Sequence, residues 1–288
     1  MGIMRKILLA SLVLFTLFVF SPLAGTLGWR AHWNLAGNRY FKGAGVYGAL
    51  LNDINLPQGI RNQLEENLDV DLIAAGAVAP DKWRMAPYFA DRSHTATYTR
   101  DQGAYWLRRA AEARAGADAN PALWDNVSYF LGIAAHYWGD TITMPHHDNA
   151  RAYYEDLYGK ELGYATWYPL HDHWEDQVYY YRENLWIVQT GYTSLDSYIN
   201  GVAIPNLNQF ILNTKGPGVN NMDGWWFEWI DGSSPTHPIF DNVGVRIEVR
   251  FPRDCEAAKS SVRLAATLLY NAWIRVLFTP EEQQQYWG

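Results

Sequence analysis

Apolar residues recur along most of the chain at the three- and four-residue spacing that places them on one face of an α-helix. Gly, Pro and Asn residues interrupt this pattern and divide it into segments. The segments expected to be helical cover residues 31–42, 58–78, 101–116, 122–139, 172–191, 195–213 and 254–278. The pattern therefore predicts an all-α fold, a single domain in which several helices pack as a bundle.

Residues 214–252 interrupt the helical pattern. The motif Gly216-Pro217-Gly218 opens this segment, and apolar and polar residues alternate from Val243 to Val249 with the period of a β-strand. We expect an irregular loop with a short strand, which forms an excursion from the helical bundle.

The N-terminus has the layout of a secretory signal peptide. Arg5 and Lys6 precede an apolar run from Ile7 to Phe20, and small residues end in Thr26-Leu27-Gly28, directly before Trp29. The run is shorter than the roughly 20 residues that span a bilayer as a helix, which favours a cleaved signal peptide over a permanent anchor. We therefore expect residues 1–28 to be removed and the protein to be secreted or otherwise extracytoplasmic.

Residues 29–288 are then expected to form one catalytic domain. They hold 21 basic and 30 acidic residues, a formal charge of −9. Extended nucleic acid binding relies on Lys and Arg, so this charge argues against it, while a small substrate stays compatible. Cys255 is the single cysteine, which excludes an intramolecular disulfide and leaves packing or bound metal to stabilise the fold.

Two His–carboxylate pairs carry the strongest chemical signal. His136 and Asp140 are four residues apart in an apolar helical segment, and His171 and Glu175 repeat the spacing. Four residues separate side chains on the same helix face, so each pair can converge on one cation. Imidazole nitrogen and carboxylate oxygen, without thiolate, suit a catalytic zinc that keeps a position open for water.

Other residues extend this candidate site. Asp81 and His94 are expected in loops beside helices, where they would complete the coordination. His147 and His173 adjoin proposed ligands at offsets that break the pairing, so we interpret them as residues that either surround the ligands or are exposed, and His237 as a loop residue.

The ordered set of these residues resembles the zinc-dependent phospholipase C family and the zinc-dependent single-strand nucleases that share its fold. The shared pattern is a Trp followed closely by a His, an Asp, a His, H-x-x-x-D with a His six residues later, and H-x-x-x-E. The matching residues are Trp29, His32, Asp81, His94, His136, Asp140, His146, His171 and Glu175. Glu175, where the nucleases tend to carry Asp, and the lack of disulfide-forming cysteines favour the phospholipase branch.

The resemblance implies a cluster of three zinc ions. One ion would be held by Asp81, His94, His136 and Asp140, with Asp140 bridging to a neighbouring ion. His32 and the amino and carbonyl groups of Trp29 would complete that neighbour, so cleavage before Trp29 would build the site. His146, His171 and Glu175 would hold the third ion.

The implied reaction is hydrolysis of a phosphodiester by a hydroxide that the zinc ions activate. Asp81 is the candidate for orienting or deprotonating the nucleophile. A phospholipid or another phosphodiester is the expected substrate, with transient contact to a membrane surface. A single-strand nuclease or nucleotidase is the first alternative, and an exported, non-enzymatic protein with structural zinc is the second.

Overall fold

The computed structural model describes the parts of the chain that hold most of the expected bundle. The described residues are 27–38, 40, 43–84, 96–142, 187, 192–202, 228–229, 238–240, 246–248 and 256–288. The side chains of 27–30, 82–84, 142, the three strands and 256–264 lie outside this description. The expected signal peptide lies almost entirely outside it, as do the expected helix at 172–191, except residue 187, and residues 203–213.

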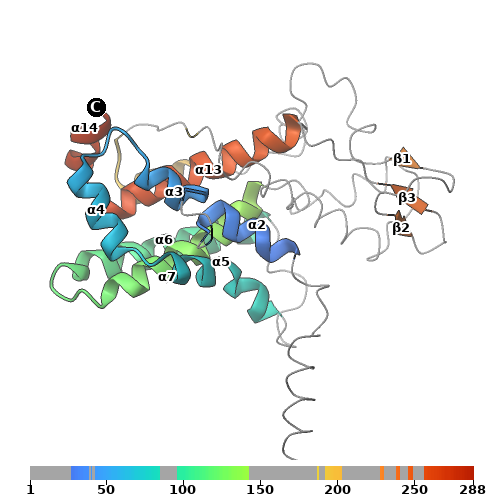
Figure 1. Ribbon diagram of the computed structural model, residues 1–288, viewed down its shortest axis with the longest axis horizontal. Helices are drawn as coiled ribbons and strands as arrows, with labels where there is room; N and C mark the ends of the chain where they lie inside the picture. The colour runs from blue at the N-terminus through green and yellow to red at the C-terminus, as the bar shows by residue number, and fades with distance from the viewer. Residues whose placement is uncertain are drawn as a thin grey trace, which may run out of the picture.

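The described chain is built mainly from α-helices, which confirms the all-α prediction (Figure 1). The helices are α2 (Leu27–Ala36), α3 (Gly45–Leu51), α4 (Gln58–Asn67), α5 (Val70–Arg84), α6 (Ala96–Ala117), α7 (Leu123–Ile142), α10 (Leu195–Gly201), α13 (Glu256–Leu277) and α14 (Pro280–Trp287).

Three short strands lie inside the segment that was expected to leave the bundle. They are β1 (Glu228–Trp229), β2 (Pro238–Phe240) and β3 (Arg246–Glu248), and they pair antiparallel in the order β1-β3-β2. The strand expected between Val243 and Val249 therefore corresponds to β3.

The helix expected at 58–78 is two helices, because Asp69 starts a new one. Leu68 has an extended backbone (φ −86°, ψ 119°) that ends α4. The Asp69 carboxylate then accepts hydrogen bonds from the backbone N–H groups of Asp71 (2.7 Å) and Leu72 (3.2 Å). A carboxylate in this position satisfies the free N–H groups of a helix start and interacts favourably with the helix dipole.

The helix expected at 31–42 is also shorter than the pattern suggested. It ends at Ala36, and α3 begins at Gly45, whose φ is +72°. A Cβ atom on Gly45 would lie 2.8 Å from the carbonyl oxygen of Asn34. Glycine is needed here for both the left-handed backbone and the close approach, and it lets α3 fold back beside α2.

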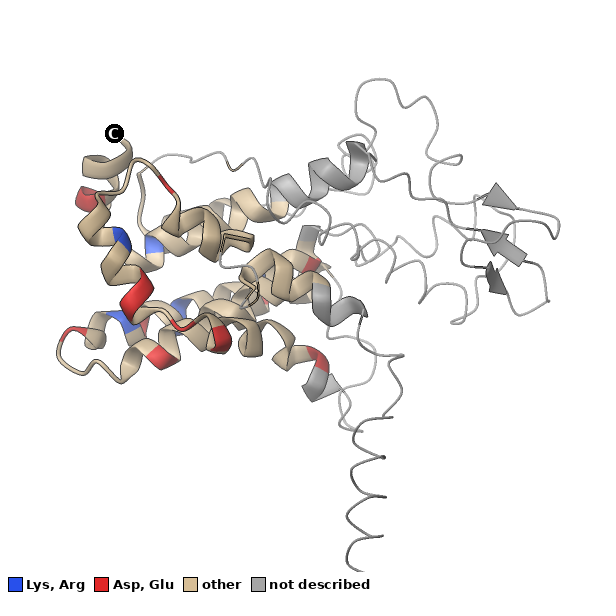
Figure 2. Cartoon of the chain, in the orientation of Figure 1, with Lys and Arg blue, Asp and Glu red and all other residues tan. Residues whose placement is uncertain are grey.

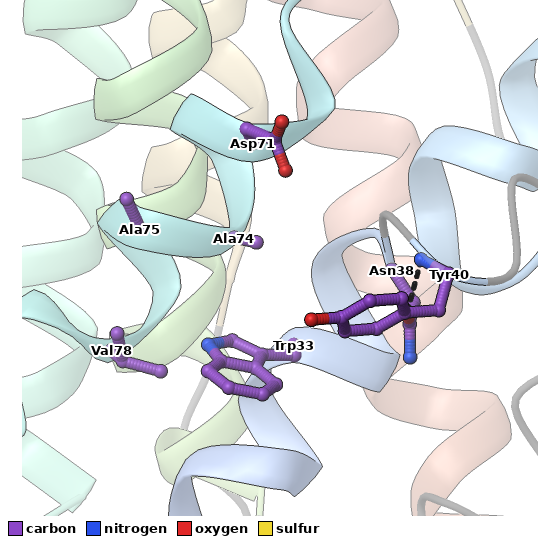
Figure 3. Close-up of a pocket in the computed structure, with 7 residues that line it drawn as sticks. All are labelled: Trp33, Asn38, Tyr40, Asp71, Ala74, Ala75 and Val78. Carbon is purple, nitrogen blue, oxygen red and sulfur yellow. Dashed lines mark hydrogen bonds between the residues drawn. The ribbon is translucent and has the colours of Figure 1, made fainter.

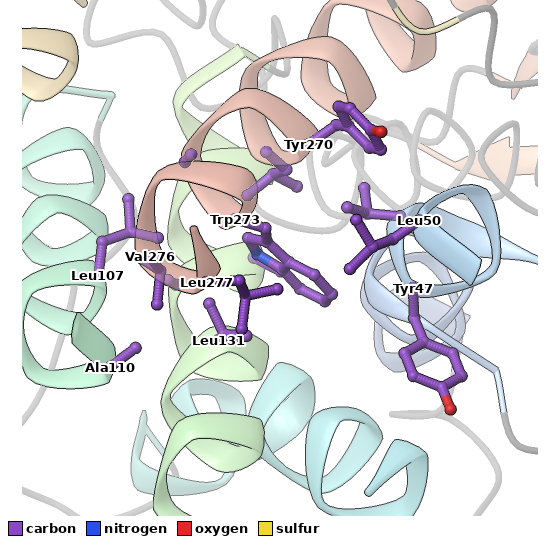
Figure 4. Close-up of a cluster of buried hydrophobic side chains, with 14 of the residues drawn as sticks. Tyr47, Leu50, Leu107, Ala110, Leu131, Tyr270, Trp273, Val276 and Leu277 are labelled. Atoms are coloured by element: carbon purple, nitrogen blue, oxygen red, sulfur yellow. The ribbon is translucent and has the colours of Figure 1, made fainter. Parts of the chain in front are cut away.

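The core is centred on α7 and α13. Trp138 and Trp273, one from each helix, are both completely buried. Figure 4 shows Trp273 of α13 among side chains from α3, α6 and α7, including Leu50, Leu107 and Leu131. Burial of each large apolar side chain contributes about 1.5 to 3 kcal/mol, so this cluster supplies much of the free energy that holds the helices together.

Helices α5 and α7 cross with their backbones in contact. A Cβ atom on Gly76 of α5 would lie 2.2 Å from the carbonyl oxygen of Tyr129. A Cβ atom on Gly132 of α7 would lie 2.1 Å from the carbonyl oxygen of Ile73. Real Cβ atoms do not approach this closely, so the crossing requires glycine on both helices.

The end of the chain is tied to the turn after α3. Trp287 of α14 donates its indole N–H to Asp53 Oδ2 (2.7 Å), and the hydroxyl of Tyr270 donates to the same oxygen. Helix α14 itself starts with a capping box, in which Thr279 and Glu282 each accept a backbone N–H from the other. These contacts explain why an amphipathic segment of eight residues forms a helix that the periodicity did not predict.

None of the helices within the described residues is long and apolar enough to cross a membrane.

The α5–α7 crossing predicts a specific sensitivity to small substitutions. We expect Gly132→Ala to lower the free energy of unfolding by about 1 to 3 kcal/mol, because the methyl group must push the helices apart. Gly59→Ala is the matched control, since its Cβ would meet nothing within 4 Å on exposed α4. That control should leave stability unchanged or raise it by up to about 1 kcal/mol. Urea unfolding followed by far-UV circular dichroism measures the free energy of unfolding of both variants. Equal changes in the two variants would contradict the close contact between α5 and α7.

Candidate metal centre

Four of the predicted metal ligands meet where α2, α5 and α7 come together. His32 is carried by α2, Asp81 by α5, and His136 and Asp140 by α7. His32, His136 and Asp140 are 5%, 0% and 1% exposed, whereas the Asp81 side chain keeps 18% of its surface exposed. The group is therefore buried, with Asp81 on its accessible side.

Asp140 presents one carboxylate oxygen to each histidine. Its Oδ1 lies 3.5 Å from His32 Nε2, and its Oδ2 lies 3.4 Å from His136 Nε2. The two imidazole rings stack at 3.8 Å between centroids with an angle of 29°. Asp140 thus lies between the two imidazole nitrogens, and its role as a bridge between two zinc ions stays a prediction.

Asp81 closes the group from the opposite helix. Its Oδ1 lies 4.0 Å from His136 Nε2, and one ligand atom from each of His32, Asp81 and His136 lies within 4.8 Å of the others. Two donors on one tetrahedral zinc stand about 3.4 Å apart, because zinc–nitrogen and zinc–oxygen bonds are about 2.0 to 2.2 Å. The two Asp140 contacts match this separation, and the Asp81 contact is slightly wider.

The hydrogen bond of His136 to α5 decides which ring nitrogen faces the group. His136 Nδ1 lies 2.8 Å from the carbonyl oxygen of Ala77. A carbonyl only accepts, so Nδ1 must carry the proton, and the lone pair of the neutral ring is then on Nε2. A metal-binding histidine is typically oriented by such a bond on its other nitrogen.

Burial makes this group costly without a cation. A carboxylate removed from water is unfavourable by several kcal/mol unless positive charge or hydrogen bonds compensate it. Asp140 is 1% exposed and faces two imidazoles that are also buried. A divalent cation would add positive charge beside this carboxylate, and the nitrogen and oxygen donors are those that zinc accepts, so the residues fit a zinc site.

Tyr137, the residue after His136, borders the group with a neutral side chain. Its ring meets the His136 ring edge to face at 5.4 Å. Burial is the largest cause that raises its pKa, followed by the neighbouring Tyr98, Asp140 and Asp81. The phenol therefore stays protonated at neutral pH and adds no further negative charge beside the carboxylates.

Asp81 was expected in a loop, and this was wrong, because it lies inside α5. The expected helix ended at residue 78, whereas α5 continues through Pro80 to Arg84. The helix places Asp81 one turn beyond Ala77, on the segment that also contacts His136.

The remaining predicted ligands lie outside the described side chains. Trp29 belongs to the backbone of α2, one turn before His32, but its side chain is not described. The other predicted ligands outside the described residues are His94, His146, His171 and Glu175. Their assignment, with that of His147, His173 and His237, stays a prediction.

Sequence reasoning missed the backbone groups that contribute to the site. The carbonyl of Ala77 carries no residue-type signal, although it orients His136. A detectable signal was the glycine in each of two apolar helical segments, Gly76 and Gly132, since a glycine inside a helix often marks a close approach.

Comparison with known families connects this geometry to a protein class. A family model described as zinc dependent phospholipase C matches residues 48–200, slightly more than half of the chain. The matched range contains Asp81, His136 and Asp140. No curated protein and no solved structure matches the chain.

The bridging position of Asp140 leads to a test by metal content. We expect Asp140→Asn to lose at least one equivalent of zinc and to weaken the remaining binding at least about 100-fold, because both imidazoles lose their shared carboxylate. The matched control is Asp196→Asn, which removes an exposed carboxylate paired with Arg108. Plasma mass spectrometry of the dialysed proteins measures the zinc, and full retention in Asp140→Asn would exclude a bridging role.

Proposed function

Because the chain belongs to the zinc-dependent phospholipase C family, we propose that it hydrolyses a phosphodiester bond, with a phospholipid as the preferred substrate. Membership makes the protein a hydrolase that uses zinc. The observation that carries the proposal is Asp140 between His32 and His136, with Asp81 at the accessible side.

The proposed reaction assigns distinct tasks to the residues of the group. When bound, zinc lowers the pKa of a coordinated water toward about 7 and acts as a Lewis acid on a phosphoryl oxygen. Asp140 places one oxygen beside the Nε2 atom of each imidazole, where a shared cation would bind, and the Ala77 carbonyl keeps His136 Nε2 aimed at the centre. The metal-binding atoms are thus in place before the substrate binds, so little reorganisation is needed during the reaction.

Asp81 is our candidate for positioning the water that attacks phosphorus. Its side chain is 18% exposed, whereas the Asp140 side chain is 1% exposed. Of these two carboxylates, Asp81 is the one that solvent and substrate can reach. A partly exposed carboxylate next to the metal ligands can accept a proton from water or orient it.

The trinuclear arrangement is part of the proposal. The first ion is assigned to Asp81, His94, His136 and Asp140, and the second to His32 with the amino and carbonyl groups of Trp29. His146, His171 and Glu175 are assigned to the third. Support for the second ion comes from the 3.5 Å separation of His32 Nε2 from Asp140, because this brings α2 to the carboxylate that would bridge both ions.

The nuclease or nucleotidase alternative has weaker support from charge. The basic residues drawn on the described helices are scattered and do not form one stripe (Figure 2). Four of them, Arg100, Arg108, Arg109 and Arg114, pair with carboxylates. Binding an extended phosphate backbone uses a run of basic side chains, so a small phosphodiester or a lipid at a membrane surface suits the described surface better.

Export is also proposed, since it would create the second site. An amino group in a peptide bond has no lone pair for a metal, whereas the free N-terminus left by cleavage before Trp29 has one. A chain located outside the cytoplasm, with its signal peptide removed, would therefore differ from its precursor in its capacity to bind zinc.

Substrate preference is tested by comparing hydrolysis of phosphatidylcholine in mixed micelles with cleavage of single-stranded DNA. We expect release of phosphocholine, abolished by a chelator and restored by zinc. Asp140→Asn should reduce the rate at least about 100-fold, equivalent to ~2.7 kcal/mol of barrier, while Asp196→Asn retains it. Preferential cleavage of DNA would support the nuclease alternative, and zinc binding without either activity would support the structural one.

Maturation is tested by the mass and the zinc content of the exported protein. We expect its first residue to be Trp29. Gly28→Arg places a large residue where the signal peptidase requires a small one and should block the cut. The uncut chain should hold one zinc fewer than the cut chain, and equal zinc content in both would exclude a role for the N-terminus.

A further inference from the structure

A second candidate site is a cavity of about 230 Å³ between α2, the turn that follows it and α5 (Figure 3). Trp33 comes from α2, Asn38 and Tyr40 from the turn, and Asp71 from the first turn of α5. Two alanines and a valine of α5 also line it. None of the four predicted metal ligands whose side chains are described lines this cavity, so the metal centre does not account for it.

The cavity adjoins the metal centre along both of its helices. Trp33 directly follows His32, and Val78 precedes Asp81 by three residues. Three residues are about one turn, a rise of about 4.5 Å along α5. A molecule in the cavity would therefore lie beside the metal centre without occupying it.

The apolar part of the lining suits the C–H face of a small ring. The indole of Trp33 and the phenol of Tyr40 face the cavity, and the small side chains of Ala74 and Ala75 leave room on the α5 side (Figure 3). Tyr40 is 68% exposed, so its ring forms the open edge through which a ligand enters.

The indole N–H of Trp33 points to a ligand that accepts a hydrogen bond. Its Nε1 is buried and has no hydrogen-bond partner within the described residues. Among the described residues Trp273 Nε1 has no partner either, but Trp273 does not line this cavity. In Figure 3 its nitrogen is on the side of the ring that faces α5. Indole is a donor only, so a ligand atom that satisfies it must be an acceptor.

Asn38 adds a second donor at the base of the cavity. Its Oδ1 accepts the backbone N–H of Tyr40 (2.8 Å), and its Nδ2 donates to Asn34 Oδ1 (2.7 Å). These bonds fix the orientation of the amide. Because the amide nitrogen has two hydrogens and one goes to Asn34, the other can serve a ligand.

Hydrogen-bond acceptors also line the cavity. Asp71 contributes a carboxylate and Tyr40 a hydroxyl. A carboxylate accepts about four hydrogen bonds, so Asp71 can take a ligand hydroxyl while it also serves other groups. The lining thus offers donors, acceptors and apolar faces to one ligand.

We propose that this cavity binds one neutral polyhydroxylated ring of monosaccharide size. A hydroxyl group both donates and accepts, so it can satisfy Trp33 and Asn38 as well as Asp71. An alkyl chain or a quaternary ammonium group offers no acceptor and would leave the Trp33 N–H buried without a partner. An anion would meet the Asp71 carboxylate. The volume is below the roughly 300 to 1,000 Å³ of pockets for drug-sized ligands, which favours a single ring.

The test measures binding by the full chain in the presence of a chelator, so that it does not depend on the proposed function. The probes are methyl α-glucoside and myo-inositol, observed by saturation-transfer NMR. We expect saturable binding with a Kd of about 1 to 10 mM, typical of a few hydrogen bonds in a small open site. Trp33→Phe, which keeps a ring and removes the N–H, should weaken binding about five- to tenfold.

Trp106→Phe is the matched control, because it removes a buried indole N–H outside the cavity, and it should leave Kd unchanged. Asp71→Asn should weaken binding as Trp33→Phe does, and thermal unfolding verifies that each variant is folded. The absence of saturable binding to folded wild-type protein would overturn the proposal. So would binding that neither Trp33→Phe nor Asp71→Asn weakens.

One further probe, glycerophosphoinositol in the presence of zinc, distinguishes two sources of the ring: the head group of a phosphodiester and a free sugar or polyol. Tighter binding than that of myo-inositol, lost in Asp140→Asn, identifies the ring as the head group of a phosphodiester that reaches the metal centre. Equal affinity for both probes identifies a site for free sugars or polyols. Either result supports the proposed class of ligand.

Discussion

The contact between the backbones of α5 and α7 is the constraint on which the candidate site depends. Gly76 and Gly132 let the two helices approach until no side chain separates them. At this distance the carbonyl of Ala77 reaches the imidazole of His136 and sets its tautomer. Two glycines, which have no functional side chain, thus determine where the lone pair of a buried histidine points.

The junction of α2, α5 and α7 also buries polar and charged side chains. Packing alone would favour apolar side chains at the junction of three helices, yet the chain places two imidazoles and the Asp140 carboxylate there. Such a group opposes stability unless charge compensates it, and a bound cation does so. The apolar core around Trp273 supplies the stability that permits this local cost.

Much of this organisation could be predicted from the sequence, and the limits have physical causes. Helical periodicity located α6, α7 and α13 closely, and the four-residue spacing identified His136 with Asp140. His32 and Asp81 lie far from that pair in the sequence, so only a family resemblance could associate them with it. Local capping by Asp69 divided one expected helix, since a side chain that satisfies helix-start N–H groups outweighs continuous apolar spacing.

The cavity beside α2 was beyond sequence reasoning for a different reason. Aromatic residues are abundant in this chain, and most aromatic side chains fill cores, so composition gives no basis for choosing Trp33. Its role depends on the room that Ala74 and Ala75 leave opposite the indole. Empty volume is a property of the packed molecule and has no counterpart in a linear pattern.

The tie between Asp53 and Trp287 has a consequence for how the molecule folds. The indole that binds Asp53 lies 234 residues away from it along the sequence. Tyr270 of α13 binds the same carboxylate across 217 residues, and Trp273 of that helix fills the core. Contacts over such separations slow folding, because the entropy of closing the long loop is lost before the contacts stabilise the chain.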